Sequence, residues 1–223
     1  MEKADTPLRQ VQANIAKACT IARREPGDVT LVAVSKTHPA EAIEPLLVQG
    51  QRHFGENRVQ EAQDKWPALR EAYSAAQLHL IGQLQSNKAD DAVALFDVIH
   101  SLDRPSLVKA LAKAMDKLDR RIPCFVQVDV GVEEQKGGCP VADLPGLLEQ
   151  ARAADIPVSG LMCIPPFEIE PAPFFAFLDR LASDHGLDGR SMGMSGDYET
   201  AVKLGATHVR VGTALFGERA SPR

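Results

Sequence analysis

Short apolar runs alternate with amphipathic stretches along the chain, at intervals of roughly 20 to 35 residues, which is the pattern of successive βα units. Eight such runs are predicted as strands, at residues 30–36, 52–57, 78–83, 97–102, 123–130, 158–164, 190–194 and 208–212. This order predicts a parallel sheet. A doubly wound open sheet has similar periodicity, but a closed (β/α)8 TIM barrel is favoured because the polar motifs below fall where such barrels carry their active sites.

The segments between these runs carry helical patterns. A first helix over about residues 6–24 precedes the first strand and is expected to cover part of the barrel. The clearest later helix is predicted to begin with Asp103 as its N-cap and Pro105 in its first turn. Its apolar face is formed by Leu107, Leu111, Met115 and Leu118.

The composition agrees with one folded domain spanning residues 1–223. Hydrophobic residues make up 44% and charged residues 25% of the chain, and no low-complexity linker divides it. A formal net charge of -5 argues against sequence-independent binding of nucleic acid. No apolar run approaches the roughly 18 residues of a membrane span, and the first residues lack the apolar core of a signal peptide. We therefore expect a cytoplasmic protein that binds neither nucleic acid nor membranes.

Cysteine and histidine spacing gives no metal motif. The four cysteines lie far apart without a CxxC pair, and most are interpreted as buried thiols. His53, His79 and His100 each lie near a predicted strand, but they form no HxH or HExxH spacing. They are therefore interpreted as packed or rim histidines, and no metal site is predicted.

A lysine ends the first apolar run, LVAVSK. Val32, Val34 and Lys36 share strand parity, which places the lysine at the rim of a pocket inside the barrel. Because burying an unpaired ammonium is costly, Lys36 should be neutralised, paired or used covalently as a nucleophile towards an aldehyde. The alternative is a lysine that extends its amine to solvent, the commoner fate of a lysine at a strand end.

Small and hydroxylated residues follow the last two predicted strands. Ser195 and Gly196 come after the seventh, and Gly212 and Thr213 after the eighth. In many barrels these two loops bind phosphate, because backbone N–H groups converge there and small residues permit close approach. The alternative is that Ser195 only N-caps a helix and Gly212 only ends a strand.

A nucleophilic amine with a phosphate site fits two classes of protein. One is a class I aldolase acting on a phosphorylated sugar, and the other is a protein that binds pyridoxal 5′-phosphate (PLP). Arg210 on the eighth strand has the parity of Gly212 and can point into the pocket. There its guanidinium, which is always protonated, can donate to the pyridine nitrogen of PLP.

Five segments together resemble the signature segments of the pyridoxal phosphate homeostasis protein family: AVSKTHP, HFGENRVQE, HLIGQLQSNK, GLMCIPP and SMGMSGDYETAVKLGATHVRVGTALFG. The resemblance implies a barrel like the N-terminal domain of alanine racemase, with PLP held as a Schiff base on Lys36. It also implies phosphate contacts from Ser195, Gly196, Gly212 and Thr213, Arg210 at the pyridine nitrogen, Asn57 in the pocket wall, and Val34 and Met162 close to the ring.

One segment departs from the family pattern. In VDVGVEEQKGG, Asp129 and Gly131 stand where relatives commonly carry asparagine and a small polar residue. The role of the loop after the fifth strand, including that of Lys136, therefore stays open between a functional residue and a loop charge.

The residues favour a PLP carrier over an enzyme. A racemase needs two acid/base groups, and Lys36 supplies only one. Tyr73 and Tyr198 are poor candidates for the second, the chain ends soon after the eighth strand, and Arg210 leaves the pyridine ring a poorer electron sink than an acid partner would. The family resemblance implies a non-catalytic role in intracellular PLP (vitamin B6) and amino-acid homeostasis, with PLP-dependent apo-enzymes as candidate recipients and a monomer as the expected state. A racemase-type PLP enzyme of low or specialised activity and the aldolase are the alternatives.

Overall fold

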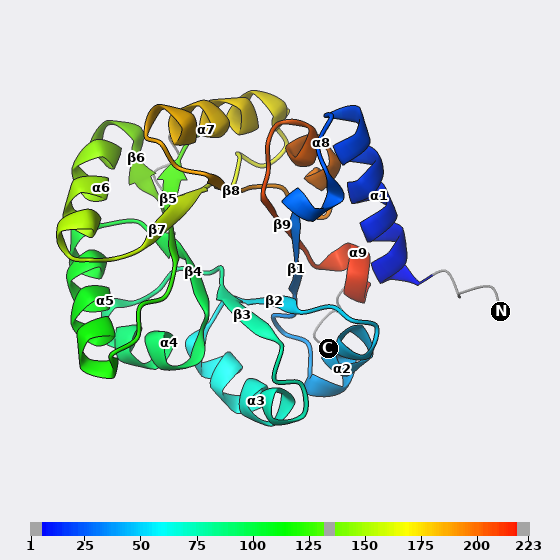
Figure 1. The fold of residues 1–223 in the computed structure, drawn as a ribbon, viewed down its shortest axis with the longest axis horizontal. Helices are drawn as coiled ribbons and strands as arrows, with labels where there is room; N and C mark the ends of the chain where they lie inside the picture. Colours follow the sequence, from blue (N-terminus) through cyan, green and yellow to red (C-terminus); the bar gives the residue numbers. More distant parts are fainter. Residues whose placement is uncertain (1–5, 132–136, 218–223) are drawn as a thin grey trace.

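A ring of parallel strands surrounded by helices forms the molecule (Figure 1). The structure is a computed structural model that describes residues 6–131 and 137–217. Within these residues the sheet runs in the order β4-β3-β2-β1-β9-β8-β7-β5-β6, and the additional pairing of β4 with β5 closes eight of its strands into a barrel. The predicted (β/α)8 barrel is confirmed.

The strands are β1 (Thr30–Val34), β2 (His53–Glu56), β3 (Gln77–Leu80), β4 (Val98–Leu102), β5 (Cys124–Asp129), β6 (Cys139–Pro140), β7 (Val158–Met162), β8 (Gly189–Ser191) and β9 (His208–Val211). The helices are α1 (Pro7–Ile21), α2 (Ala40–Val48), α3 (Val59–Ala72), α4 (Ala89–Leu95), α5 (Pro105–Leu118), α6 (Leu144–Ala153), α7 (Ala172–Asp184), α8 (Tyr198–Lys203) and α9 (Thr213–Phe216).

Each of the eight predicted strands is present, but most end earlier than predicted. The first was predicted to reach residue 36 and ends at Val34, and the seventh was predicted to reach residue 194 and ends at Ser191. At these carboxyl ends the backbone leaves the hydrogen-bonded ladder and turns to form the mouth of the barrel. The apolar run continues past the paired strand, as with Cys163 and Ile164 after β7 and Met192 and Met194 after β8, so the sequence pattern extended the predicted strands too far. Strand β6 was not predicted, because two residues carry no periodicity.

The predicted first helix is α1, with Thr6 as its N-cap accepting from the backbone N–H of Arg9. It lies on the outside of the barrel beside α8 and α9 (Figure 1). The residues it buries recur every three or four positions, as an amphipathic helix requires: Leu8, Val11, Ile15, Ala18 and Cys19. Because α8 and α9 are short, much of the apolar face of α1 packs against these two helices.

Two details of the predicted helix after β4 are corrected. Arg104, not Asp103, occupies the N-cap position of α5, and the Asp103 carboxylate instead accepts from the Arg104 guanidinium at 2.6 Å. Pro105 is the first helical residue, as predicted. Leu118 is 39% exposed, so the buried stripe of this helix ends at Met115. The helix terminates directly after Leu118 with Asp119 in the left-handed conformation, which leaves this last side chain at the edge of the packed face.

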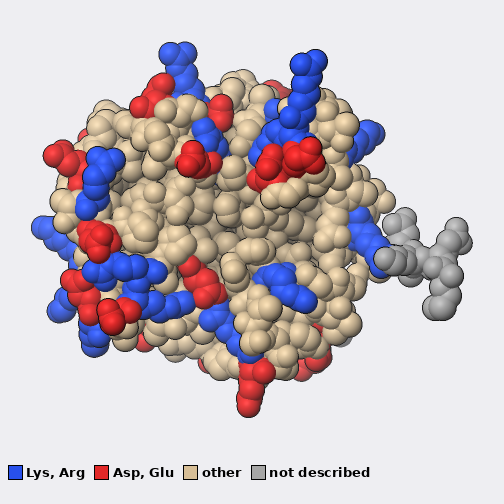
Figure 2. Space-filling model, in the orientation of Figure 1, with Lys and Arg blue, Asp and Glu red and all other residues tan. Residues whose placement is uncertain are grey.

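Charged side chains gather mainly over the outer helices, whereas the middle of the face seen down the barrel is largely uncharged (Figure 2). None of the described helices is both long enough and apolar enough to cross a bilayer.

Candidate functional site

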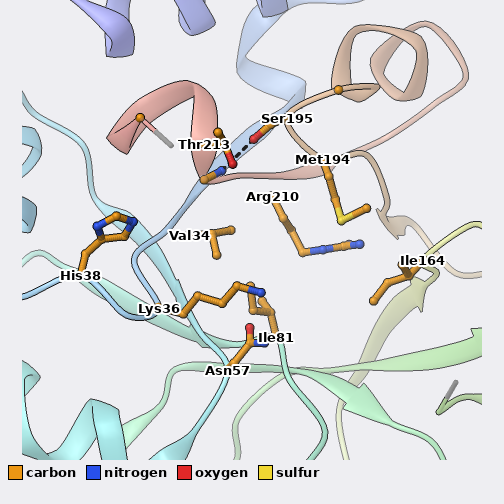
Figure 3. A pocket seen from close by; sticks show the side chains of 13 residues that line it. Val34, Lys36, His38, Asn57, Ile81, Ile164, Met194, Ser195, Arg210 and Thr213 are labelled. Carbon is orange, nitrogen blue, oxygen red and sulfur yellow. Dashed lines mark hydrogen bonds between the residues drawn. The ribbon is translucent and has the colours of Figure 1, made fainter. Parts of the chain in front are cut away.

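A cavity of about 300 Å³ opens at the carboxyl ends of the strands, a size that suits a small cofactor. Its wall brings together residues from both ends of the chain (Figure 3). The lining residues are Val34, Lys36, His38, Asn57, Ile81, Ile164, Met194, Ser195, Gly196, Arg210, Gly212, Thr213 and Gly217. Eight of the nine predicted cofactor-contacting residues therefore lie in one cavity.

Met162 is the exception among the predicted residues. Its side chain is fully buried in the barrel interior with Val98 and Phe125, and it is not part of the cavity wall. Ile164, two residues further along, lines the cavity instead. The chain from β7 thus contributes to the mouth only after the strand has ended.

Five lining residues were not predicted: His38, Ile81, Ile164, Met194 and Gly217. Ile81 directly follows β3, Ile164 lies two residues after β7, and Met194 directly precedes Ser195. The rule that selected Lys36 also applies to the first two, because residues just beyond barrel strands surround the mouth. Ile81 and Ile164 were not predicted because an apolar side chain does not by itself indicate a binding site in a sequence.

Lys36 and Arg210 reach the cavity from neighbouring strands. Strand β1 pairs with β9, with Val32 opposite Arg210, and Lys36 stands in the turn that follows β1. In the close-up view both side chains point into the same space, with Val34 between them (Figure 3). Lys36 and Arg210 were predicted to be neighbours, and both line the same cavity.

The turn that carries Lys36 is held from behind by α3. Lys65 donates to the carbonyl oxygens of Ser35 at 2.9 Å and His38 at 3.0 Å, one on either side of Lys36. Thr37 has a positive φ of 65°, a conformation that is costly for a β-branched residue. Its N–H donates to the Glu61 carboxylate, and its hydroxyl donates to the carbonyl of Lys36 at 2.6 Å. These bonds hold the strained turn in place.

A buried carboxylate lies under the same turn. Glu56 is fully buried on β2 and forms an ion pair with Lys65 at 2.9 Å. Its Oε1 also accepts from the Ser35 hydroxyl at 2.6 Å and from the indole N–H of Trp66 at 3.0 Å. Burial raises the pKa of Glu56, and the three donors oppose that shift. We call Glu56, Glu61 and Lys65 the lysine-side clamp.

The opposite wall of the cavity is built from two turns joined by one hydroxyl. Ser195 Oγ accepts from the backbone N–H groups of Gly212 at 3.1 Å and Ala214 at 3.5 Å (Figure 3). Ser195 is therefore not the N-cap of α8, since Asp197 occupies that position. A side-chain carbon added at Gly212 would lie 3.4 Å from Val34, so this turn passes close to β1. We call Ser195, Gly196, Gly212 and Thr213 the anion-side turns.

Arg210 forms the floor between these two walls. It is 4% exposed, and its Nη1 donates to Ser191 Oγ at 2.6 Å while its Nη2 donates to the carbonyl of Cys163 at 2.9 Å. Burial lowers the pKa of Arg210, but a guanidinium stays protonated in proteins. These two bonds use only two of the five N–H donors of the guanidinium. Arg210 is therefore a cation held in place at the cavity, with further N–H groups that can donate to a ligand.

The tyrosines lie elsewhere. Tyr198 is buried against α1, where its hydroxyl accepts from Asn14 at 2.9 Å, and the Tyr73 hydroxyl donates to Glu44 at 3.1 Å. Neither belongs to the cavity wall. The interpretation of Tyr198 as a packing residue is confirmed.

The four cysteines are all buried, as predicted for most of them. Burial raises the pKa of Cys124 and Cys163 to about 12, which keeps both as thiols. In the loop after β5, the N–H of Gly131 donates to the carboxylate of Asp129 at 3.2 Å. Lys136 lies outside the described residues.

The donors around the cavity suit a small aldehyde with an anionic tail. One wall carries an amine, the facing wall carries backbone N–H groups with two hydroxyls, and the floor carries a fixed cation. A side-chain carbon added at Gly196 would meet no atom within 4 Å, so this turn leaves room for a bulky group against its backbone. The site can thus hold a phosphorylated aldehyde by one covalent and several polar contacts.

Known proteins share both the sequence and the fold. The family model for the alanine racemase N-terminal domain matches residues 7–220. The pyridoxal phosphate homeostasis protein of Pseudomonas aeruginosa is 40% identical over 218 residues, covering 95% of this chain and 94% of the relative. The protein of the same name from Aquifex aeolicus is 39% identical over 222 residues, covering 95% and 96%.

Solved structures agree with this assignment. PipY of Synechococcus elongatus PCC7942, solved with PLP bound, is 40% identical and superposes with a TM-score of 0.81 over 91% of this chain and 100% of PipY. Alanine racemase of Clostridium difficile 630, at 16% identity and a TM-score of 0.68 over 94% of this chain and 60% of the racemase, shares the fold. The chain therefore belongs to the pyridoxal phosphate homeostasis protein family, within the broader family of the alanine racemase N-terminal domain.

Proposed function

We propose that this protein is a non-catalytic PLP-binding protein that serves intracellular PLP and amino-acid homeostasis. The observation that carries the proposal is that Lys36, Arg210 and the anion-side turns line one cavity of suitable size. The relatives named pyridoxal phosphate homeostasis protein and the PLP-bound structure of PipY support the choice of cofactor.

Each wall has a proposed role. When bound, PLP supplies the aldehyde that Lys36 Nζ attaches covalently, together with an anionic phosphate. The anion-side turns, Ser195, Gly196, Gly212 and Thr213, bind that phosphate through backbone N–H groups and hydroxyls. Arg210 donates to the pyridine nitrogen, and Val34 and Asn57 flank the ring. Met162, which is buried with Val98 and Phe125 and does not line the cavity, is not proposed to contact the cofactor.

The placement of side chains favours a carrier over a racemase. An α-proton exchange needs a second acid/base group opposite the lysine. Both tyrosines of the chain are held outside the cavity, by Asn14 and Glu44. Arg210 would donate to the pyridine nitrogen without giving up its proton, which would leave the ring a poorer electron sink than an acid partner would.

The setting of this function is part of the same proposal. We propose that residues 1–223 act as one PLP-binding domain, as a monomer in the cytoplasm, and that the protein passes PLP to PLP-dependent apo-enzymes. Transfer of PLP to an apo-enzyme faster than its release into buffer would support delivery, and equal rates would contradict it.

Absorbance spectroscopy tests the cofactor directly. The purified protein with PLP should show a visible band that borohydride removes, and mass spectrometry after reduction should place the label on Lys36. The Lys36→Ala variant should lose the band, whereas Lys88→Ala, which changes an exposed lysine on another element, should keep it. A label on a different side chain would contradict the proposal. Robust exchange of amino-acid α-protons in deuterated water would contradict the carrier function.

A further inference from the structure

A chain of hydrogen-bonded polar side chains crosses the barrel interior and ends at Arg210. His53 Nδ1 lies 3.0 Å from His79 Nε2, and His79 Nδ1 lies 2.9 Å from His100 Nε2. His100 Nδ1 lies 2.8 Å from Ser191 Oγ, which accepts from Arg210 Nη1 at 2.6 Å. The five residues come from β2, β3, β4, β8 and β9, so five strands contribute to one network.

The network is largely buried, and burial disfavours the charged form of its histidines. His79, His100 and Ser191 are at most 1% exposed. Burial is the main cause that lowers the pKa of His79 and His100 well below the usual value, and the neighbouring histidines add to it. Only His53 approaches solvent, at the amino-terminal end of β2, where it lines a separate cavity of about 370 Å³. The hydrogen-bonded network thus runs from one end of the barrel to Arg210, at the floor of the cavity at the other end.

The arginine determines the direction of every hydrogen bond in this network. A guanidinium has donors and no acceptor, so Ser191 Oγ accepts from Arg210. The only other described partner of this hydroxyl is His100 Nδ1, so we assign its proton to that bond. His100 then carries its proton on Nε2 and donates to His79 Nδ1. His79 in turn carries its proton on Nε2 and donates to His53 Nδ1. His79 and His100 are therefore the Nε2–H tautomer, each donating away from Arg210.

We infer that His100 and Ser191, supported by His79 and His53, are positioning residues that hold Arg210 in one orientation and present it with acceptors. The part of this inference that concerns the cofactor rests on the proposed function. Because the hydrogen bonds are all directed away from the site, the network presents acceptors to Arg210 and has no proton to deliver through it. When PLP is bound, Arg210 held in this way would offer the pyridine nitrogen a donor that keeps its own proton.

Simple packing is the competing explanation. The ring of Phe125 stacks on that of His100, with centroids 4.5 Å apart and an angle of 20° between the planes, and an apolar ring could stack there equally well. Two substitutions separate the explanations. His100→Phe keeps an aromatic ring against Phe125 but removes the acceptor for Ser191, whereas the amide oxygen of His100→Asn can replace that acceptor while losing the ring. His185→Phe, in a histidine at the end of α7, is the matched control.

The first test uses nitrogen NMR of the protein without PLP, so it does not depend on the proposed function. We expect long-range proton–nitrogen spectra to show the Nε2–H tautomer for His79 and His100, and to show slow rotation of the Arg210 guanidinium. His100→Phe should lose the slow rotation, and His100→Asn and His185→Phe should keep it. An Nδ1–H tautomer or an imidazolium at either buried histidine would overturn the inference.

The second test uses the spectrum of bound PLP. His100→Phe should shift the visible band and weaken PLP binding about tenfold, as expected for the loss of a hydrogen bond to a charged group, whereas His100→Asn should stay near the parent protein. Should His100→Phe fold poorly, Ser191→Ala removes the same link with the loss of one atom and should give the same shift. A folded variant of either kind with the parent spectrum and affinity would show that the network only packs the barrel.

The two tests also separate this inference from the proposed function. Failure of the parent protein to bind PLP would contradict the proposed function. The histidine tautomers and the rotation of the Arg210 guanidinium, measured without PLP, would in that case still support or contradict the positioning network.

Discussion

The lysine-side clamp and the anion-side turns face each other across one cavity, but they are built by different physical means. The clamp uses charged side chains that are largely or fully buried, with Lys65 and Glu56 side chains 10% and 0% exposed, and it holds a turn in which Thr37 has a positive φ. The anion-side turns use backbone N–H groups and the hydroxyl of Ser195. A single amine that must meet an aldehyde needs its turn held by many bonds, whereas an anion can be bound by peptide dipoles that the fold already provides.

This difference predicts that the two walls fail differently when they are changed. Damage to the clamp should be seen first as lost stability, because a buried charge loses its partner. Damage to the anion-side turns should be seen first as lost PLP affinity, because their polar groups lie at the surface of the cavity. The predictions below test this separation, in order of decreasing effect.

The largest effect is expected for Lys65→Met. The substitution keeps the length of the side chain but leaves the carboxylate of Glu56 buried without its cation, which should lower the free energy of unfolding by about 3 kcal/mol. Urea unfolding followed by circular dichroism measures this change. Lys88→Met is the matched control, because its ion pair with Asp91 is partly exposed and should contribute less than about 0.5 kcal/mol. Equal decreases in the free energy of unfolding in both variants would show that the buried ion pair of the clamp contributes no more to stability than a surface pair.

The same variant should become sensitive to pH. Burial already raises the pKa of Glu56, and Lys65 is one of the groups that oppose this shift, so Lys65→Met should raise the pKa further. The folded variant then binds a proton above the usual glutamate pKa of 4.5 where the unfolded chain does not, so its stability should fall as the pH rises through that window. The slope is at most about 1.4 kcal/mol per pH unit for one proton. Lys65→Met combined with Glu56→Gln should lose this slope, and a slope that persists would assign it to another group.

On the anion side, Ser195→Ala and Thr213→Ala should each weaken PLP binding about tenfold, and the double variant more than either alone. Equilibrium titration of the visible band measures these affinities. Ser195→Ala also leaves the N–H of Gly212 without its acceptor, so it should cost about 1 kcal/mol of stability. A stability loss with unchanged PLP affinity would reduce Ser195 to a structural link between two turns.

How far the sequence predicts this molecule differs between the two walls. The anion-side turns and Lys36 were found because barrel strands reveal themselves by apolar periodicity and their carboxyl ends converge on one mouth. The clamp was not found, although Glu61 and Lys65 stand four residues apart on a helix, because that spacing is common on solvated helix faces. Only the fold shows that this face of α3 lies under the turn of Lys36.

The histidine network was missed for a related reason. His53, His79 and His100 were interpreted as packed or rim histidines, and the structure packs His79 and His100 in the interior with His53 at the rim. Their order along one line depends on the shear of the barrel, which sets residues of neighbouring strands beside one another. Met162 shows the same limit, since its strand was predicted but its depth in the barrel was not. Sequence periodicity predicts which face of a strand a side chain occupies. Its position along the barrel axis depends on how the closed sheet staggers neighbouring strands.

The smallest effect on stability, and the finest test of the comparison, is expected for Gly196→Ala. An added methyl there would meet no protein atom within 4 Å, so the free energy of unfolding should change by less than about 0.5 kcal/mol. The methyl would occupy space beside the phosphate, however, and PLP affinity should fall. Gly146→Ala makes the same chemical change in the first turn of α6, also with no atom within 4 Å, where alanine should raise stability by up to about 0.5 kcal/mol and leave PLP affinity unchanged. If both variants bind PLP with the affinity of the parent protein, the turn after β8 does not face the phosphate. The claim that the anion-side turns determine PLP affinity while the lysine-side clamp determines stability would then be wrong.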